Sequence, residues 1–131
     1  MNSPKINLSV NLNKIALIRN SRKNNTPDLK KFVDLAIKNN VNGITVHPRP
    51  DGRHILKEDV FLIADILKEY PEIEFNIEGN PFYEVIELVK SVKPDQFTLV
   101  PDLPETLTSN AGWNISKDKN NNKTDRSLYT D

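Results

Sequence analysis

Apolar and polar residues follow two different periods along this chain, and the two kinds of segment alternate. Residues 6–11 alternate apolar with polar side chains, and residues 41–47 form a β-branched run, so both segments are predicted to be strands. Residues 73–78 and 96–100 have the same short apolar character and are predicted as the third and fourth strands. The stretches between them repeat at helical spacing, which predicts strands and helices in alternation.

Three helices are predicted between the four strands. The first begins at Thr26-Pro27-Asp28, with Thr26 as the expected cap, because threonine caps free amides and proline tolerates the first helical position. The second covers residues 57–70, and the third begins at residues 80–81 and ends before Pro94. Each helix has one apolar face, and the residues on these faces are Leu29, Phe32, Val33, Ala36, Ile37, Val60, Ile63, Ala64, Leu67, Val85, Leu88, Val89 and Val92.

The order βαβαβαβ predicts an α/β fold in which helices cover a sheet of parallel strands. An open doubly wound sheet and a (β/α)8 TIM barrel both fit this order. No Gly-x-Gly-x-x-Gly follows the first strand, which weakens the dinucleotide-binding form of the open sheet. A complete barrel takes about 250 residues. The 131 residues of this chain therefore correspond to about half of a TIM barrel.

The end of the chain differs from the rest. Residues 114–131 have few large apolar side chains and no helical or strand period, so we expect a disordered or truncated tail there. Residues 1–113 are the predicted partial TIM-barrel domain. We expect four barrel strands to leave two open sheet edges and an apolar inner face without its opposite wall. Such a chain is expected to be marginally stable or to aggregate.

Charge and composition narrow the class of partner. Eighteen basic side chains balance eighteen acidic ones, so the net charge does not favour nucleic acid or a membrane surface. The chain has no cysteine, which excludes disulfides, thiolate metal sites and cysteine nucleophiles. No segment has the pattern of a signal peptide or a membrane span, so a cytoplasmic location is expected.

Polar side chains collect where the predicted strands end, and in barrels these carboxyl ends form the active-site face. His47 ends the second strand and is a candidate general acid or base; the alternative is a buried histidine that only satisfies a backbone carbonyl. Glu78 ends the third strand and is a candidate base; the alternative is a cap on the next helix. The other candidates at these ends are Asn11, Asn13, Lys14, Arg49, His54 and Thr108.

Guanidinium groups bind phosphate oxygens in a bidentate manner. The candidate phosphate ligands of this kind are Arg22, Arg49 and Arg53, and the alternative for each is a solvated surface charge. Two imidazoles and one carboxylate can also bind zinc, which raises the possibility of a metal site at His47, His54 and Glu78. Their spacing matches no compact motif such as His-Glu-x-x-His, so no metal is expected.

Four segments of the chain together resemble one known family. They are residues 10–22 (VNLNKIALIRNSR), 43–54 (GITVHPRPDGRH), 76–79 (NIEG) and 99–102 (LVPD). In this order they are similar to segments of the pyridoxine 5'-phosphate synthase family, and the resemblance extends from about residue 6 to residue 113. The string at residues 43–54 is long and specific, so chance similarity is a poor explanation.

The resemblance implies a (β/α)8 barrel that assembles as a homo-octamer and works without a metal or other cofactor. It implies condensation of 1-deoxy-D-xylulose 5-phosphate with 3-amino-2-oxopropyl phosphate to give pyridoxine 5'-phosphate, phosphate and water. By resemblance, His47 and Glu78 are acid/base groups for imine formation, dehydration and ring closure, and Asn11 contacts the phosphate of the amino ketone. The remaining substrate contacts that it implies are Asn13, Lys14, Arg22, Arg49, His54 and Thr108.

Two departures from the family pattern bear on activity. Many members carry Asp-His where this chain has Asn13 and Lys14, so an amide and an ammonium replace an acid and an imidazole. The family's second half also supplies another catalytic histidine and Gly-rich phosphate-binding turns, whereas the histidines of this chain are His47 and His54. We therefore expect no measurable turnover from this chain alone. The alternative function is an inactive remnant that binds phosphate ligands or associates with a complete barrel.

Overall fold

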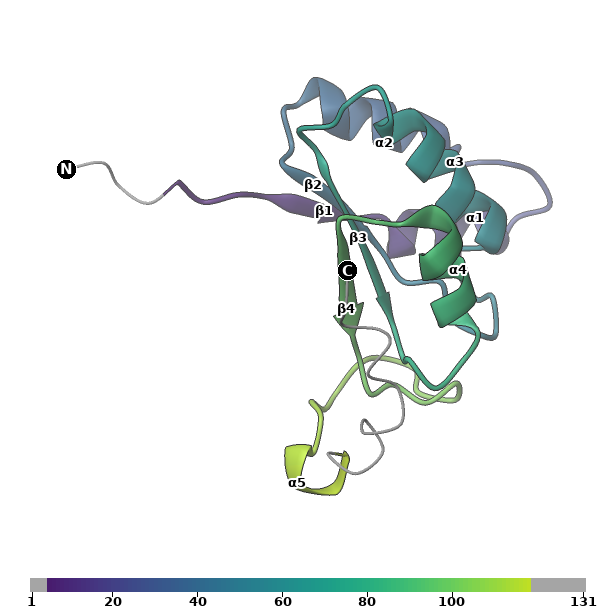
Figure 1. Cartoon of the computed structure of the whole chain (residues 1–131). Coiled ribbons are helices and arrows are strands. Elements are labelled where there is room, and N and C mark those ends of the chain that lie inside the picture. The colour runs from purple at the N-terminus through teal and green to yellow at the C-terminus, as the bar shows by residue number, and fades with distance from the viewer. Residues whose placement is uncertain (1–4, 119–131) are drawn as a thin grey trace.

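The computed structural model of the chain describes residues 5–118, in which strands and helices alternate around one sheet (Figure 1). In chain order the elements are β1 (Ser9–Asn11), α1 (Asn13–Asn20), α2 (Leu29–Lys38), β2 (Gly43–Val46), α3 (Lys57–Leu67), β3 (Glu74–Gly79), α4 (Val85–Val92), β4 (Gln96–Leu99) and α5 (Ile115–Asp118).

The four strands form one parallel sheet in the order β1-β2-β3-β4. Asn11 is paired with Thr45, Thr45 with Asn76, and Glu78 with Thr98. Figure 1 shows the helices that connect the strands gathered on one side of the sheet. A doubly wound sheet would reverse its strand order and carry helices on both faces. The predicted α/β fold is confirmed, and the sheet is the first half of a (β/α)8 barrel.

The apolar core lies between the sheet and the helices. Ile44 and Val46 of β2 and Phe75 and Ile77 of β3 are buried on the face that the helices cover. The residues that the helices add to this core include Val33, Val60, Ile63, Leu67 and Leu88. Burial of each large aliphatic side chain contributes about 1.5–3 kcal/mol, so this layer supplies the main stabilising term of the fold.

The opposite face of the sheet, which corresponds to the barrel interior, is polar. Ser9 Oγ and Thr45 Oγ1 lie 2.7 Å apart, and Asn76 Nδ2 donates to Thr45 Oγ1 over 3.3 Å. Thr98 Oγ1 donates to Asn76 Oδ1 over 2.9 Å, so a hydrogen-bonded chain crosses all four strands. The expectation of an apolar inner face is wrong. Side chains alternate between the two faces of a strand, and here the aliphatic residues face the helices while the polar ones face the opposite side. A Cβ at Gly43 would lie 2.9 Å from Ser9 Oγ, so the glycine leaves room for these side-chain hydrogen bonds.

Helix α1 is not predicted by the sequence pattern. It begins directly after Leu12. The buried side chains of Leu12 and the helix are Leu12, Ala16 and Arg19. These positions are four and three residues apart, which is helical spacing. The stripe is short and one of its three members is charged, so the apolar period is too weak to identify a helix.

Two predicted helix starts are wrong. The N-cap of α2 is Asp28 rather than Thr26, because the Asp28 side chain accepts a hydrogen bond from Lys30 N over 3.0 Å. Helix α4 begins at Val85 and not at residues 80–81. Asn80 Oδ1 accepts from Phe82 N over 3.0 Å, so Asn80 closes a turn before the helix instead of capping it.

The short helix α5 lies within the segment 114–131 that we expected to be a disordered tail, and the part of that segment after Asp118 lies outside the described residues. Within residues 5–118, no helix combines the length and the apolar character needed to cross a membrane.

Candidate functional site

The carboxyl ends of β1 and β2 are joined by a short hydrogen-bonded path. Asn11 Oδ1 accepts from Asn13 N over 2.9 Å, and Asn13 Oδ1 accepts from the backbone N of His47 over 2.8 Å. The side-chain oxygen of Asn13 is therefore already engaged in holding the backbone at His47. Asn11 and Asn13 support the strand end that presents His47, in addition to any contact with a ligand.

His47 is a buried histidine that is neutral near pH 7. Its residue is 6% exposed, and burial, followed by the positive charge of Arg49, lowers its pKa from 6.5 to about 4. A neutral imidazole has one nitrogen free to accept a proton. His47 is therefore in the protonation state that a general base requires.

His54 lies close to His47, although seven residues separate them in the chain. The centroids of the two rings are 6.1 Å apart. Burial, followed by electrostatic interactions with His47, Arg49 and Arg53, lowers the pKa of His54 from 6.5 to about 4. The loop after β2 thus brings both histidines of the chain to one site.

Glu78 lies on the polar inner face of β3, one residue before the end of the strand. Its residue is half-buried, and burial, followed by the negative charge of Asp102, raises its pKa above 4.5. Val46, the last residue of β2, is paired with Ile77 of β3, and the next residues along the two segments are His47, just beyond β2, and Glu78 of β3. The sheet therefore brings the two predicted acid/base residues to the same edge, on the same face.

Arg49 connects the loop after β2 to the loop after β4. Its Nη1 donates to Asp102 Oδ2 over 3.2 Å, and its Nη2 donates to the carbonyl oxygens of Leu103 (3.1 Å) and Thr106 (2.5 Å). Both side chains of the Arg49–Asp102 pair are about 5% exposed or less. Arg49 Nε is buried, and among the described residues it has no hydrogen-bond partner. The predicted phosphate ligand is thus engaged with protein groups here.

Arg53 holds the same loop from the outside. Its Nη1 donates to Thr106 O and Leu107 O over 2.8 and 3.1 Å, and its Nη2 donates to Pro104 O over 2.9 Å. Its Nε donates to Asp51 Oδ2 over 2.8 Å, which aligns the guanidinium. Arg49 and Arg53 together fix the backbone that leads to Thr108.

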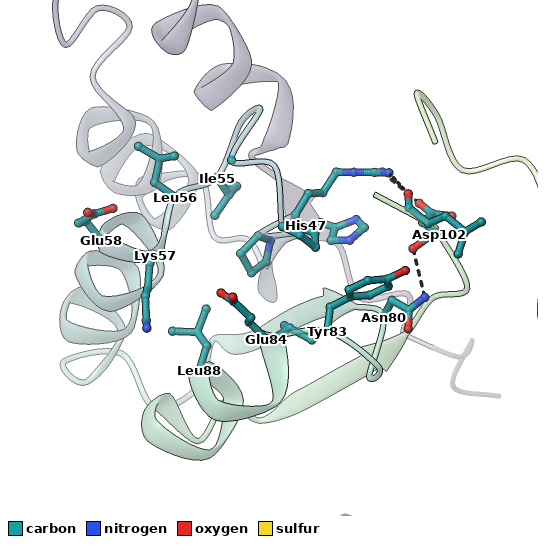
Figure 2. A pocket seen from close by; sticks show the side chains of 16 residues that line it. His47, Ile55, Leu56, Lys57, Glu58, Asn80, Tyr83, Glu84, Leu88 and Asp102 are labelled. Carbon is teal, nitrogen blue, oxygen red and sulfur yellow. Dashed lines mark hydrogen bonds and ion pairs between the residues drawn. The ribbon is translucent and has the colours of Figure 1, made fainter. Parts of the chain in front are cut away.

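A pocket of about 210 Å³ opens between the loops that follow β2, β3 and β4 (Figure 2). His47, Tyr83 and Asp102 line one part of it, and Leu56 and Leu88 give it an apolar floor. The dashed line between Asn80 and Asp102 in Figure 2 marks the bond from Asn80 Nδ2 to Asp102 O, 3.2 Å long. The pocket is large enough for a small polar molecule next to His47.

Three predicted site residues make none of the side-chain contacts that hold this cluster together. Lys14 is exposed on α1, and Thr108 is exposed in the loop after β4. Arg22 is exposed beyond α1, where it lines an open hollow with Lys23 and Gly52. The structure therefore brings together Asn11, Asn13, His47, Arg49, His54 and Glu78, and it leaves Lys14, Arg22 and Thr108 at its periphery.

Sequence reasoning missed several buried polar residues that shape the site. Asp102 belongs to the segment LVPD and pairs with Arg49, and Asn80 holds the carbonyl of Asp102. Arg19 and Asp59 form a buried ion pair below the loop that carries His54. The Arg19–Asp59 pair could have been detected from the sequence, because each residue is charged and lies at a position of its helix that the helical period places in the core.

The described residues contain no group of three His, Cys, Asp or Glu side chains that could hold a metal ion.

Buried histidines with lowered pKa values, a carboxyl group with a raised pKa and paired arginines at the carboxyl ends of parallel strands are typical of (β/α)-barrel enzymes. Comparison with known proteins identifies the family. The family model described as "Pyridoxal phosphate biosynthesis protein PdxJ" matches residues 8–126. The chain belongs to this family, whose curated relatives are enzymes named pyridoxine 5'-phosphate synthase.

Two of these relatives illustrate the similarity. The pyridoxine 5'-phosphate synthase of Cytophaga hutchinsonii is 55% identical over 106 residues, which cover 81% of this chain and 43% of that protein. The enzyme of Porphyromonas gingivalis is 49% identical over 110 residues, which cover 84% of this chain and 44% of that protein. The chain thus spans a little less than half the length of these relatives.

Proposed function

We propose that this chain supplies the first-half residues of a pyridoxine 5'-phosphate synthase site. The reaction condenses 1-deoxy-D-xylulose 5-phosphate with 3-amino-2-oxopropyl phosphate and releases phosphate and water. The observation that carries the proposal is the placement of His47, directly after β2, and Glu78, on the adjacent strand β3, with opposite pKa shifts. Pairs of ionisable groups whose environments shift their pKa values in different directions are what acid/base catalysis requires.

The two groups suit different proton transfers. The neutral ring of His47 accepts a proton from the substrate carbon or amine, because its nitrogen is unprotonated near pH 7. Glu78, whose pKa is raised, holds a proton more readily than an exposed carboxyl and can return it to a leaving hydroxyl group. Imine formation, loss of water and ring closure each need such a transfer. This assignment of roles is part of the proposal.

Phosphate recognition is assigned to the cations around these groups. Arg49 Nη2 donates to two carbonyl groups, so a phosphate bound through this nitrogen has to displace Leu103 O and Thr106 O. Exposed Lys14 and Arg22 can meet a phosphate without such a rearrangement. We therefore assign first contact to the exposed cations and final binding to Arg49 and His54.

A second candidate is binding without turnover, either of phosphorylated ligands or of a complete barrel. The polar inner face favours it, because the chain of Ser9, Thr45, Asn76 and Thr98 can exchange hydrogen bonds with another polar surface. Binding alone needs no proton donor beyond the residues of this chain, whereas the condensation needs the further histidine that the family's second half supplies.

One experiment separates the two candidates. The purified chain is supplied with both phosphorylated substrates, and pyridoxine 5'-phosphate is measured by mass spectrometry while substrate binding is measured by calorimetry. Turnover that His47→Ala and Glu78→Gln abolish, and that Lys68→Ala on the exposed surface of the protein leaves unchanged, supports the synthase. Saturable binding of deoxyxylulose phosphate without product, weakened by Arg49→Met, supports the second candidate. Absence of both product and binding contradicts both candidates.

A further inference from the structure

Arg19 and Asp59 form a buried, two-pronged ion pair between α1 and α3. Arg19 Nη1 donates to Asp59 Oδ1 over 2.6 Å, and Arg19 Nη2 donates to Asp59 Oδ2 over 2.8 Å. The two side chains are 10% and 9% exposed. Arg19 Nε also donates to Asn20 Oδ1 over 3.0 Å, so each nitrogen of the guanidinium has an acceptor. A pair of this geometry fixes the directions of both side chains.

The ion pair and its neighbour Asn20 hold the turn at residues 53–56. Asn20 Nδ2 donates to the carbonyl oxygens of His54 (2.7 Å) and Arg53 (3.2 Å), and Arg19 Nη2 reaches His54 O at 3.4 Å. On the other side, Asp59 Oδ2 accepts from Leu56 N over 2.8 Å. The backbone on both sides of the His54 ring is therefore tied to one buried polar cluster.

The His54 ring is attached to this turn by one of its own nitrogens. The backbone N–H of Ile55 donates to His54 Nδ1 over 2.8 Å, and Ile55 is 1% exposed. A nitrogen that accepts a hydrogen bond carries no proton, so the neutral ring has its proton on Nε2. The turn thus presents His54 as a hydrogen-bond donor through Nε2–H in a fixed direction.

We propose that Arg19 and Asp59 are positioning residues that hold His54 in its Nε2–H tautomer and fix the direction of that N–H at the site. The role of the N–H as a ligand for a substrate phosphate rests on the proposed function, whereas the positioning itself does not. No bond is made or broken in this role, because Arg19 and Asp59 act only through the turn. An exposed ion pair on the same turn would be screened and mobile, whereas this pair is buried and fully hydrogen-bonded.

Histidine NMR tests the proposal without any substrate. The chain has two histidines, so long-range ¹H–¹⁵N correlation of uniformly labelled protein resolves both rings, and their tautomers are read from the nitrogen shifts. We expect one Nε2–H tautomer for His54 in the unsubstituted protein. Arg19→Lys keeps a cation beside Asp59 but cannot bond both carboxylate oxygens and His54 O, so we expect a mixture of tautomers. The pKa of His54 should then rise from about 4 towards 6.5, since a loosened ring is better hydrated.

The charged groups that also act on His54 are His47, Arg49, Arg53 and Asp51, and they remain in every variant. A matched control is Asp34→Asn, which breaks the exposed Lys30–Asp34 pair of α2 and should leave the His54 signals unchanged. The double variant Arg19→Met with Asp59→Leu replaces the pair by apolar side chains, which keeps the helices packed while removing the polar ties. We expect mixed tautomers there as well.

The result that overturns the proposal is a folded Arg19→Lys or double variant in which His54 keeps one tautomer and its pKa near 4. Failure of both variants to fold, judged by dispersion of the amide spectrum, also overturns it, because the pair is then required for folding generally and not for His54. Absence of both synthase turnover and substrate binding in the unsubstituted chain contradicts only the proposed function, since these spectra are recorded without substrate.

Discussion

Arg49 and Asp102, 53 residues apart in the chain, meet as an ion pair of 3.2 Å whose side chains are 5% and 4% exposed. The pair joins the loop after β2 to the loop after β4, so the two sides of the pocket next to His47 are connected directly. Asp102 also accepts a hydrogen bond from Ser109 Oγ and, through its carbonyl, from Asn80. The site is therefore braced by charges that the solvent does not screen.

Asp102→Ala should destabilise the chain strongly, because it leaves the guanidinium of Arg49 buried without its counter-charge. The expected loss is about 3–5 kcal/mol in the free energy of unfolding, measured by urea denaturation. Asp34→Ala, which breaks the exposed Lys30–Asp34 pair, should cost less than about 1 kcal/mol. Equal losses in the two variants would mean that the Arg49–Asp102 pair is solvated.

Stability should fall as the pH is lowered from about 6.5 to about 4. His47 and His54 have a pKa of about 4 in the folded chain and an ordinary value of 6.5, so in this range the unfolded chain binds protons that the folded chain does not. Each unit of difference corresponds to about 1.4 kcal/mol. Glu78, whose pKa is raised by folding, acts in the opposite direction and offsets part of this loss.

The measurement is the urea midpoint at pH 7 and at pH 5. His47→Gln should make the urea midpoint less dependent on pH. Glu78→Gln should make it more dependent on pH, because the substitution removes the carboxyl group that partly offsets the contribution of the histidines. A midpoint that stays constant in Glu78→Gln would show that the histidines are not held neutral by the fold.

Gly79→Ala should destabilise the end of β3. A Cβ at Gly79 would lie 2.8 and 2.9 Å from the two Cγ atoms of Val85, at the first turn of α4. The expected cost is about 1–3 kcal/mol. Combining it with Val85→Ala removes the clash, so the double variant should cost less than the sum of the two single ones. If the free-energy costs of the two single variants simply add, the contact with Val85 is not the cause of the destabilisation by Gly79→Ala.

Asn76→Ala should weaken the sheet through its inner face. Asn76 is 8% exposed and bonds both Thr45 and Thr98, so its loss leaves two threonine hydroxyls without that partner. We expect a cost of about 1–3 kcal/mol by urea denaturation. Gln96→Ala, at the exposed first residue of β4, is the control and should cost much less. A neutral Asn76→Ala would indicate that water replaces the amide without loss.

The strands could be predicted from the sequence because their aliphatic residues are consecutive or alternate, as in residues 43–46 and 74–79. The strand ends then placed Asn11, His47 and Glu78 together correctly. Helix α1 was missed because Arg19 occupies a buried position of its stripe. The sequence pattern reports the period of apolar residues, and a buried charge that is paired from another helix interrupts that period.

The engagement of Arg49 could not be predicted either. An arginine near a predicted pocket has the same sequence signal whether its partner is a phosphate or the carboxylate of a residue 53 positions later. The partner depends on the path of the loop after β4, which contains Pro101 and Pro104 and has no helical or strand period. Long-range loop contacts of this kind are fixed by tertiary structure alone.

Water wets the inner face of this sheet. Its hydroxyl and amide groups exchange protein hydrogen bonds for bonds to solvent, whereas an aliphatic wall of the same area would drive molecules together. A half-barrel with this surface should therefore not aggregate through its inner face, and the two open sheet edges remain as the reason to expect aggregation. Sheet-to-sheet contacts between molecules should then involve the outer strands β1 and β4, whose outward-facing backbone groups can pair with another strand in a parallel or antiparallel sense.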